Sequence, residues 1–308
     1  MPRGDQQDVT EYILPQLAES IISKGGDTVR LVAFRDAGSV RYGLVEGDEI
    51  RPIPDATTPS DAARLAGTTA QGTGVSLADA SLVAPVLPLV RNLFCVGWNY
   101  VDHFAEGAAV RGAGGVQEIP DRPTFFTKAT RTVIGPFDTI ELHAAVTQSL
   151  DWEVELAVVI GHGARDIPEE DALDHVLGFT VANDVSGRNV QREHGGQWFR
   201  GKSLDGTCPI GPWIVTPDEL GALDERAITC RVNGETVQSA TLGDLHFGVP
   251  RIIAELSRGL TLETGDVILT GTPSGVGFAR TPPRFLAAGD VVESEIEGIG
   301  TLRNEVAG

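Results

Sequence analysis

The segment Trp152–Ile160, with the sequence WEVELAVVI, constrains the fold more than any other part of the chain. Side chains alternate along a strand, so Glu153 and Glu155 share one face and lie about 6 to 7 Å apart. The continuation Ala157–Ile160 is apolar on both faces, which is typical of a strand inside a covered sheet. Carboxylates at the start of a buried strand need a partner, because an unpaired buried charge is costly. The alternative is the solvated outer face of a half-buried strand.

The rest of the pattern predicts an α+β, β-rich fold, because runs of short strands occur with few helices and no regular βαβ alternation. Apolar spacing in Glu11–Lys24 predicts one amphipathic helix, and Val29–Phe34 and Tyr42–Val45 read as strands. Prolines in Ala84–Pro88 indicate a linker. We therefore expect an N-terminal helix and small β-rich domain over residues 1–85, and a larger domain over residues 90–306.

Two later helices are expected. Asp166 followed three residues later by Glu169 resembles a capping box that opens a helix ending near Val176. Apolar residues on one face of Val249–Arg258 predict a second helix, with Gly259 in the left-handed position that follows a helix.

Composition excludes several partners. With 24 Lys and Arg against 43 Asp and Glu, the formal net charge is -19, so nucleic acids and anionic membranes are repelled. A small acidic substrate would need local positive charge at its site. Three widely spaced cysteines read as free thiols, and the N-terminus lacks a secretion pattern, so we expect a cytoplasmic protein with no membrane span.

Asp184 offers a third carboxylate for the site suggested by Glu153 and Glu155. It follows the strand Phe179–Ala182 and precedes Ser186, which has the side chain of a helix cap. Three oxygen ligands without Cys or His suit Mg²⁺ or Mn²⁺ better than Zn²⁺. An ordinary turn aspartate remains the alternative reading.

A possible proton-transfer pair lies in Asn99–Glu106. If this segment is helical, His103 and Glu106 share a face, and the carboxylate orients the imidazole so that it can activate a water. A surface helix pair gives the same pattern. The following segment, Gly107–Gly115, is rich in Gly and Ala and resembles either a mobile lid or an insertion.

Lysine is scarce, so Lys128 and Lys202, each flanked by apolar or small residues, are candidates to offset substrate negative charge. A lysine extending from a strand edge is the alternative. The loop Gly271–Gly277 follows a strand and is suited to presenting backbone N–H groups to a carboxylate oxygen. It lacks the ending of a nucleotide-binding phosphate loop.

These elements, in their order along the chain, resemble the fumarylacetoacetate hydrolase family over about residues 90–306. The motifs that carry the resemblance are Cys95–His103, Glu153–Glu155, Asn183–Ser186, Gly201–Ser203 and Leu269–Pro273.

The resemblance implies a roll of mixed β-sheets, usually as a homodimer, with one Mg²⁺ or Mn²⁺ per chain held by Glu153, Glu155 and Asp184. It also implies a water-activating pair of His103 and Glu106. Lys202 would then stabilise substrate charge, and the substrate pocket would be lined by Arg188, Gln191 and Thr272.

The segment Gly195–Trp213 is most similar to relatives that cleave acylpyruvates or diketo deoxy sugar acids. The expected function is hydrolysis of a C–C bond in a small β-diketo acid, which gives a 2-oxo acid and a carboxylic acid. Two alternatives remain: an oxaloacetate-type decarboxylase or tautomerase on the same scaffold, and a metal-binding protein without catalysis.

Overall fold

The computed structural model describes residues 30–69, 74–108, 116 and 118–308. The helix expected over Glu11–Lys24 lies outside these residues, as does most of the expected lid over Gly107–Gly115. No helix in the described ranges is long and apolar enough to cross a membrane.

The predicted buried strand forms as β11, Val154–Ile160, and all of its side chains are buried. It pairs antiparallel with β12, Val176–Asn183, on one side and with β17, Val267–Leu269, on the other. A strand paired on both sides and covered on both faces has no water-facing surface, which confirms the inference drawn from its apolar run.

Around β11, twelve strands of the described chain form one large mixed sheet, with the order β4-β3-β2-β1-β14-β12-β11-β17-β6-β7; β5 pairs with β1, and β8 with β14. Its other strands are β1 (Arg30–Asp36), β2 (Ser39–Glu46), β3 (Glu49–Pro52), β4 (Val75–Ser76), β5 (Ser81–Val83), β6 (Leu93–Gly97), β7 (Thr124–Lys128), β8 (Val133–Ile134) and β14 (Cys208–Val215).

A second sheet with the order β16-β15-β18-β19-β9 packs against the first, and β10 pairs with β13. These strands are β9 (Ile140–Glu141), β10 (Leu150–Asp151), β13 (Ser186–Gly187), β15 (Ala227–Val232), β16 (Glu235–Thr241), β18 (Val291–Ile296) and β19 (Gly300–Ala307).

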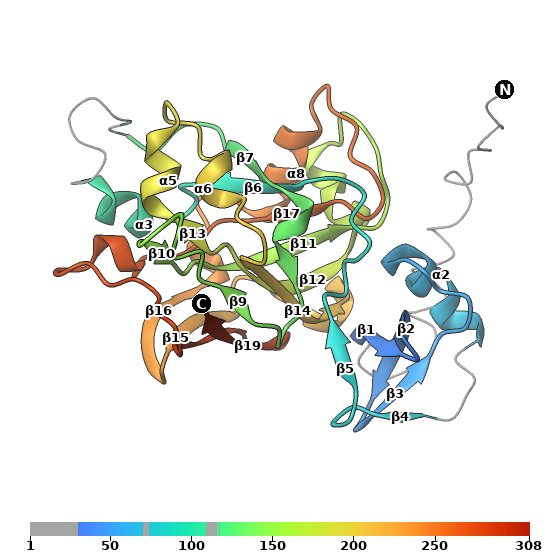
Figure 1. Cartoon of the computed structure of the whole chain (residues 1–308). Coiled ribbons are helices and arrows are strands. Elements are labelled where there is room, and N and C mark those ends of the chain that lie inside the picture. The colour runs from blue at the N-terminus through green and yellow to red at the C-terminus, as the bar shows by residue number, and fades with distance from the viewer. Residues whose placement is uncertain (1–29, 70–73, 109–115, 117) are drawn as a thin grey trace, which may run out of the picture.

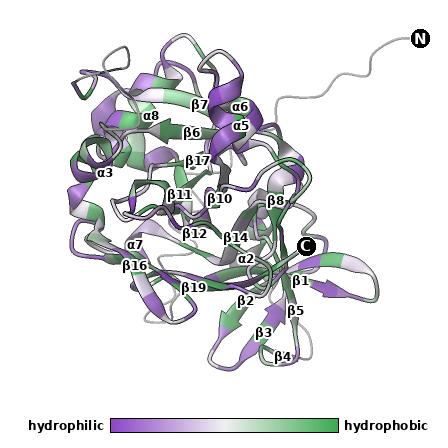
Figure 2. Cartoon of the chain, turned by 60° about the vertical axis from the view of Figure 1, so that its left-hand side comes forward, coloured by the Kyte–Doolittle hydropathy of each residue, from purple (hydrophilic) through white to green (hydrophobic). Residues whose placement is uncertain are grey.

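The two faces of β11 belong to different hydrophobic cores. Leu156 and Val158 pack with residues of the second sheet and of the helix α8 (Val249–Ser257). Ala157 and Val159 pack toward β1, β6 and β14. Figure 2 shows hydrophobic colour in the central strands of the molecule. Glu153 and Glu155 therefore extend the second of these faces, beyond the end of its apolar packing.

Helices are short and lie around the sheets (Figure 1). They are α2 (Pro59–Thr69), α3 (Val101–Glu106), α5 (Arg188–Glu193), α6 (Phe199–Lys202), α7 (Pro217–Leu220), α8 (Val249–Ser257) and the 3-10 turns η1 (Thr130–Thr132), η2 (Glu169–His175), η3 (Leu242–Asp244) and η4 (Gly277–Ala279). The predicted helix before Gly259 is confirmed as α8, and Gly259 has a φ of 71°.

Two predicted helix caps are wrong. Asp166 has a φ of 58° and its carboxylate accepts the N–H of Gly259, so it stabilises a loop contact, and η2 begins after Pro168 instead. Ser186 donates its hydroxyl to the carbonyl of Asp184, and the residue before α5 is Gly187. Both polar side chains satisfy nearby backbone groups, a use that competes with helix capping.

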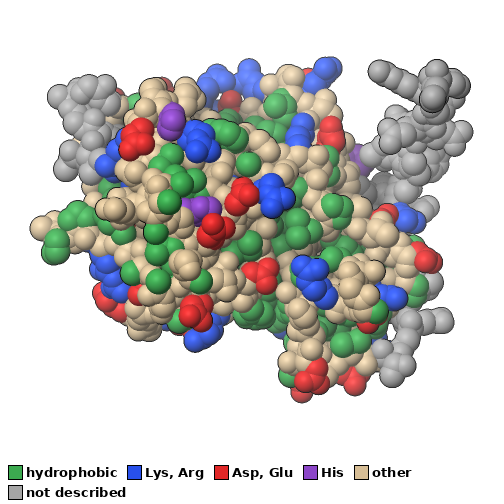
Figure 3. Space-filling model, in the orientation of Figure 1, with side chains coloured by type: hydrophobic (Ala, Val, Ile, Leu, Met, Phe, Trp, Pro, Cys, Tyr) green, Lys and Arg blue, Asp and Glu red, His purple; other side chains and the backbone are tan. Residues whose placement is uncertain are grey.

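The β-rich, mixed-sheet fold class predicted from the sequence is confirmed. The N-terminal strands are continuous with the large sheet, because β1 pairs with β14 through Arg30 and Leu31. The domain division near residues 85–90 stays a prediction. On the face shown in Figure 3, acidic and basic side chains are interspersed and no patch of one sign dominates.

Candidate active site

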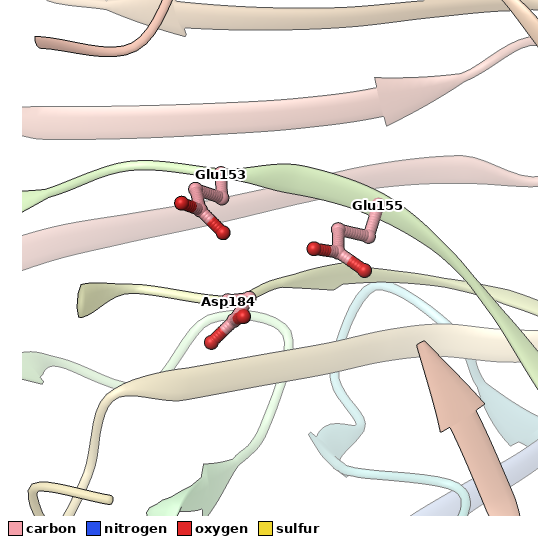
Figure 4. Close-up of side chains that lie close together, drawn as sticks. All are labelled: Glu153, Glu155 and Asp184. Carbon is pink, nitrogen blue, oxygen red and sulfur yellow. The ribbon is translucent and has the colours of Figure 1, made fainter. Parts of the chain in front are cut away.

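Strand pairing brings the three predicted carboxylates together. Val154 lies opposite Asn183 in the β11–β12 ladder, and the N–H of Asp184 donates to the carbonyl of Glu153 at 2.8 Å. Residues opposite each other in a ladder share a face, so Asp184 points to the same side as Glu153 and Glu155. Figure 4 shows the two glutamates directed from one strand toward Asp184.

The three carboxylates form a compact, buried cluster. Each offers an oxygen within 4.8 Å of the others, and their exposed fractions are 4% for Glu153, 1% for Glu155 and 0% for Asp184. Like charges this close and this dry repel strongly unless cations balance them.

Basic side chains balance two of the three. Lys202 Nζ lies 2.6 Å from both Glu153 Oε2 and Asp184 Oδ2 and so bridges them. Lys128, fully buried on β7, lies 2.7 Å from Asp184 Oδ1 and donates to the carbonyl of Val185. Arg188 Nη1 lies 2.6 Å from Glu153 Oε1.

Glu155 has a different environment. The hydrogen bond recorded for it comes from the N–H of Gly271 at 2.6 Å, and within the described residues no ion pair joins it to a basic side chain. Burial, together with the charges of Asp184 and Glu153, raises the pKa of Glu155 well above its usual range. For Glu153, burial is outweighed by Lys202 and Arg188, which hold its pKa below the usual range.

The loop after β17 tethers two acidic groups. Gly271 donates to Glu155, and the N–H of Gly275 donates to Glu106 Oε2 at 2.8 Å. Gly271 has a φ of 102°, and a Cβ there would lie 2.8 Å from Asn99 Cβ, so a glycine is required. The predicted N–H donors of this loop thus serve carboxylates of the chain itself.

His103 and Glu106 form the predicted pair on α3. His103 Nδ1 lies 2.7 Å from Glu106 Oε1, and their side chains are 11% and 19% exposed. With Nδ1 engaged and Glu106 fixed by Gly275, Nε2 is the ring nitrogen left for exchanging a proton with another molecule. The helical turn places the two residues on one face, as their spacing predicts.

One cavity of about 400 Å³ joins the carboxylates to this pair. Of the residues singled out in the sequence, His103, Glu153, Glu155, Arg188, Gln191, Lys202 and Thr272 line it. Part of its wall is aromatic: Trp198 packs edge-on against Trp98 and Phe126, with ring centroids 4.9 and 5.2 Å apart.

Three singled-out residues do not line the cavity. Glu106 reaches it through His103, Asp184 lies behind the two glutamates, and Lys128 contacts the side of Asp184 away from Lys202. Lys128 is therefore placed to hold Asp184, and its predicted contact with a substrate stays a prediction.

Asp151 is a site residue that the sequence reasoning missed. Its buried carboxylate accepts from Arg188 Nε at 2.8 Å and from the N–H groups of Gly277 and Phe278. It thereby fixes Arg188 against the cavity wall, where the Arg188 guanidinium lies 4.5 Å from the ring centroid of Phe278. Asp151 immediately precedes Trp152, but nothing in the local sequence indicates its partner 37 residues later.

The carboxylate cluster fits a divalent cation. In octahedral Mg²⁺ sites the metal–oxygen distance is about 2.0–2.1 Å, so ligand oxygens lie up to about 4.2 Å apart; those of the cluster lie within 4.8 Å. Glu155 forms no ion pair with a basic side chain in the described chain, so its buried carboxylate is the member of the cluster that still lacks a balancing cation. The Lys202 ammonium bridges two of the carboxylates and would have to yield part of this position to a metal.

Comparison with known proteins bears on this site. A family model described as fumarylacetoacetate (FAA) hydrolase C-terminal matches residues 92–307, and one described as Rv2993c-like, N-terminal matches residues 29–85. The chain is 46% identical over 231 residues to oxaloacetate tautomerase YisK of Bacillus subtilis, covering 75% of this chain and 74% of the relative.

Solved structures of the same fold also match the chain. A fumarylacetoacetate hydrolase from the psychrophilic Exiguobacterium antarcticum has a TM-score of 0.77 and 41% identity, covering 91% of this chain and 99% of its own. A 5-carboxymethyl-2-hydroxymuconate delta-isomerase from Mycobacterium smegmatis has a TM-score of 0.74 and 35% identity, covering 90% and 99%. Hydrolysis, the main expectation from the sequence, is not confirmed, and the tautomerase or isomerase alternative fits these relatives better.

Proposed function

Because this chain is an enzyme of the fumarylacetoacetate hydrolase family, we propose that it catalyses keto–enol tautomerisation of a small 2-oxo acid with the help of Mg²⁺ or Mn²⁺. The observation that carries the proposal is that Glu153, Glu155 and His103 line the same cavity, with Asp184 next to the two glutamates. Tautomerisation needs a group that polarises the 2-oxo oxygen and a base near the adjacent carbon, and the carboxylate cluster and His103 provide them.

The metal-binding residues in this proposal are Glu153, Glu155 and Asp184. A bound Mg²⁺ or Mn²⁺ supplies Lewis acidity, which lowers the pKa of the C–H bond next to a 2-oxo group. The oxygen ligands suit these hard cations. Lys128 acts as a positioning residue, because its ammonium holds Asp184 from behind.

His103 is the proposed acid–base residue. Its Nε2 takes a proton from C3 of the keto form, which breaks the C–H bond, and the His103 imidazolium then returns a proton to the oxygen at C2, which forms the enol and restores the neutral imidazole. Glu106 keeps Nδ1 protonated and oriented and stabilises the imidazolium formed in this step. Lys202, held at the cluster, offsets negative charge that develops on the 2-oxo oxygen.

The competing function on the same residues is hydrolysis of an acylpyruvate-type diketo acid. The observation that favours it is the His103–Glu106 pair itself, because a base able to accept a carbon-bound proton can also deprotonate water. Decarboxylation of an oxaloacetate-type acid is a further outcome to be measured. The homodimer implied by the family stays a prediction.

The test compares two substrates with Mn²⁺-loaded protein and an EDTA control. We expect faster interconversion of the enol and keto forms of oxaloacetate, followed by the ultraviolet absorbance of the enol, with no release of CO₂. We expect no pyruvate and acetate from acetylpyruvate. Cleavage of acetylpyruvate without an effect on the oxaloacetate tautomers would replace the proposal with the hydrolase, and CO₂ release would replace it with the decarboxylase.

A further inference from the structure

Arg192 is a cation of the cavity wall that the proposed mechanism leaves unused. It lies on α5 one helical turn after Arg188, and residues four apart share a helix face. Both arginines line the cavity, and both lie against Phe278: Cζ of Arg192 is 5.4 Å from the ring centroid and Cζ of Arg188 is 4.5 Å. Phe278 in turn is fixed through its N–H to Asp151.

The two arginines differ in their partners. Arg188 is buried and forms ion pairs with Asp151 and Glu153, whereas Arg192 is exposed and forms no ion pair with a carboxylate among the residues that the structure describes. Lys202 is likewise committed to Glu153 and Asp184. Among the lysines and arginines of the described cavity wall, Arg192 is therefore the one without a carboxylate partner from the protein.

We propose that Arg192 is a specificity-determining residue that binds a second, distal carboxylate, so that the enzyme selects short 2-oxo dicarboxylates over 2-oxo monocarboxylates. This inference rests on the proposed function. The 2-oxo acid end lies at the carboxylate cluster, and the distal carboxylate extends along the Arg188–Phe278 wall to Arg192. The planar guanidinium offers two parallel N–H donors that match a carboxylate.

The shape and charge of the site agree with this assignment. A cavity of about 400 Å³ holds an acid of a few carbons. The chain carries a formal net charge of -19, so a dianion that binds in the cavity needs local positive charge near each of its two carboxylates. Stacking on Phe278 holds the Arg192 guanidinium in place without neutralising it.

The experiment measures binding without turnover. Malate and 2-hydroxybutyrate share a chelating 2-hydroxy carboxylate and a four-carbon chain, but only malate has a distal carboxylate. Isothermal titration calorimetry of the Mn²⁺-loaded protein gives the ratio of their two Kd values. We expect malate to bind about 10-fold more tightly, the lower end of the range for a hydrogen bond to a charged group, because Arg192 is exposed.

Two variants and a control test the residue. Arg192→Leu should bring the Kd ratio close to one by weakening malate alone, and Arg192→Lys should retain part of the preference, since an ammonium lacks the fork of donors. Arg200→Leu, the same substitution at an exposed residue of α6 that does not line the cavity, should keep the wild-type ratio.

A Kd ratio in Arg192→Leu equal to that of the wild type would overturn the inference and leave Arg192 as a surface residue stacked on Phe278. The absence of any preference for malate in the wild-type protein would overturn it as well. Failure of the tautomerase assay with the preference intact would instead reject the proposed function and keep this binding role.

Discussion

The cavity brings together two sets of charged side chains, which differ in how they are held. The carboxylate set is Glu153, Glu155 and Asp184: Glu153 and Asp184 lie just beyond the paired ends of β11 and β12 and form ion pairs with Lys202 and Lys128 in a buried network. The helical set is His103 and Arg192, which lie on the short helices α3 and α5. Figure 1 shows these helices at the border of the sheets.

The difference separates two requirements of one enzyme. A cation site needs several ligands held to within a few tenths of an ångström, and a paired β-sheet provides this precision. Acid–base chemistry and substrate choice depend on single side chains. On a short helix such a residue can be substituted without disturbing the packing of the core. We therefore expect substitutions in the carboxylate set to abolish metal binding and substitutions in the helical set to leave metal binding intact.

The largest expected effect on metal binding is at Glu155. Glu155→Gln removes one of three anionic ligands, and we expect Mn²⁺ affinity to fall by at least about 100-fold, because losing even an outer partner of a metal ligand costs 10- to 100-fold. Calorimetric titration with Mn²⁺ measures this. Glu305→Gln, an exposed carboxylate on β19, is the matched control and should bind normally. Normal Mn²⁺ binding by Glu155→Gln would remove it from the ligand set.

The second prediction concerns the helical set. His103→Ala should lower kcat of the tautomerase by about 10²- to 10⁴-fold, the usual contribution of a positioned acid–base group, while Mn²⁺ affinity stays unchanged. Glu106→Gln should have a smaller effect of the same kind, because His103 remains. If His103→Ala lost Mn²⁺ binding together with activity, the separation of roles between the carboxylate set and the helical set would be wrong.

The third prediction uses the raised pKa of Glu155. The folded, metal-free protein keeps a proton on Glu155 that the unfolded chain releases above pH 4.5, so stability should fall as pH rises from 4.5 through the raised pKa. Urea unfolding at a series of pH values should show this slope in the wild type. The slope should be smaller in Glu155→Gln and in wild-type protein saturated with Mn²⁺, while the part due to the raised pKa of buried Asp151 remains. Equal slopes in the wild type and the variant would contradict the raised pKa.

The smallest expected effect is at the aromatic wall. A Cβ at Gly97 would lie 2.3 Å from Trp198 Cζ3, so Gly97→Ala should displace the indole and cost about 1–3 kcal/mol of stability through overpacking. Urea unfolding gives the cost, and tryptophan fluorescence reports the displacement. The double variant Gly97→Ala with Trp198→Leu should recover part of the stability. No recovery would show that the strain arises elsewhere.

The sequence predicted the parts of the fold and site that depend on local periodicity. The alternation in Trp152–Ile160 identified a buried strand with two carboxylates on one face, and the spacing of His103 and Glu106 identified a pair on one helix turn. Such patterns are visible because the partners are neighbours along the chain or share its repeat.

The remainder depends on contacts between distant segments. Asp151 pairs with Arg188 and with the backbone near Phe278, and Trp198 packs over Gly97, but no local pattern encodes either contact. The failed capping box has the same cause: Asp166 bonds to Gly259, a residue 93 positions later. The choice between hydrolysis and tautomerisation also lay beyond the sequence, because the same cluster and base serve both reactions.

The short ladder between β1 and β14 has a consequence for truncation. β14 pairs with β12, the strand that leads into Asp184, and β1 covers its opposite side at Val215 and Ile214. Without the N-terminal strands, these β14 backbone groups would form an open edge able to recruit a strand from another molecule. A shortened enzyme that keeps every site residue should therefore tend to aggregate.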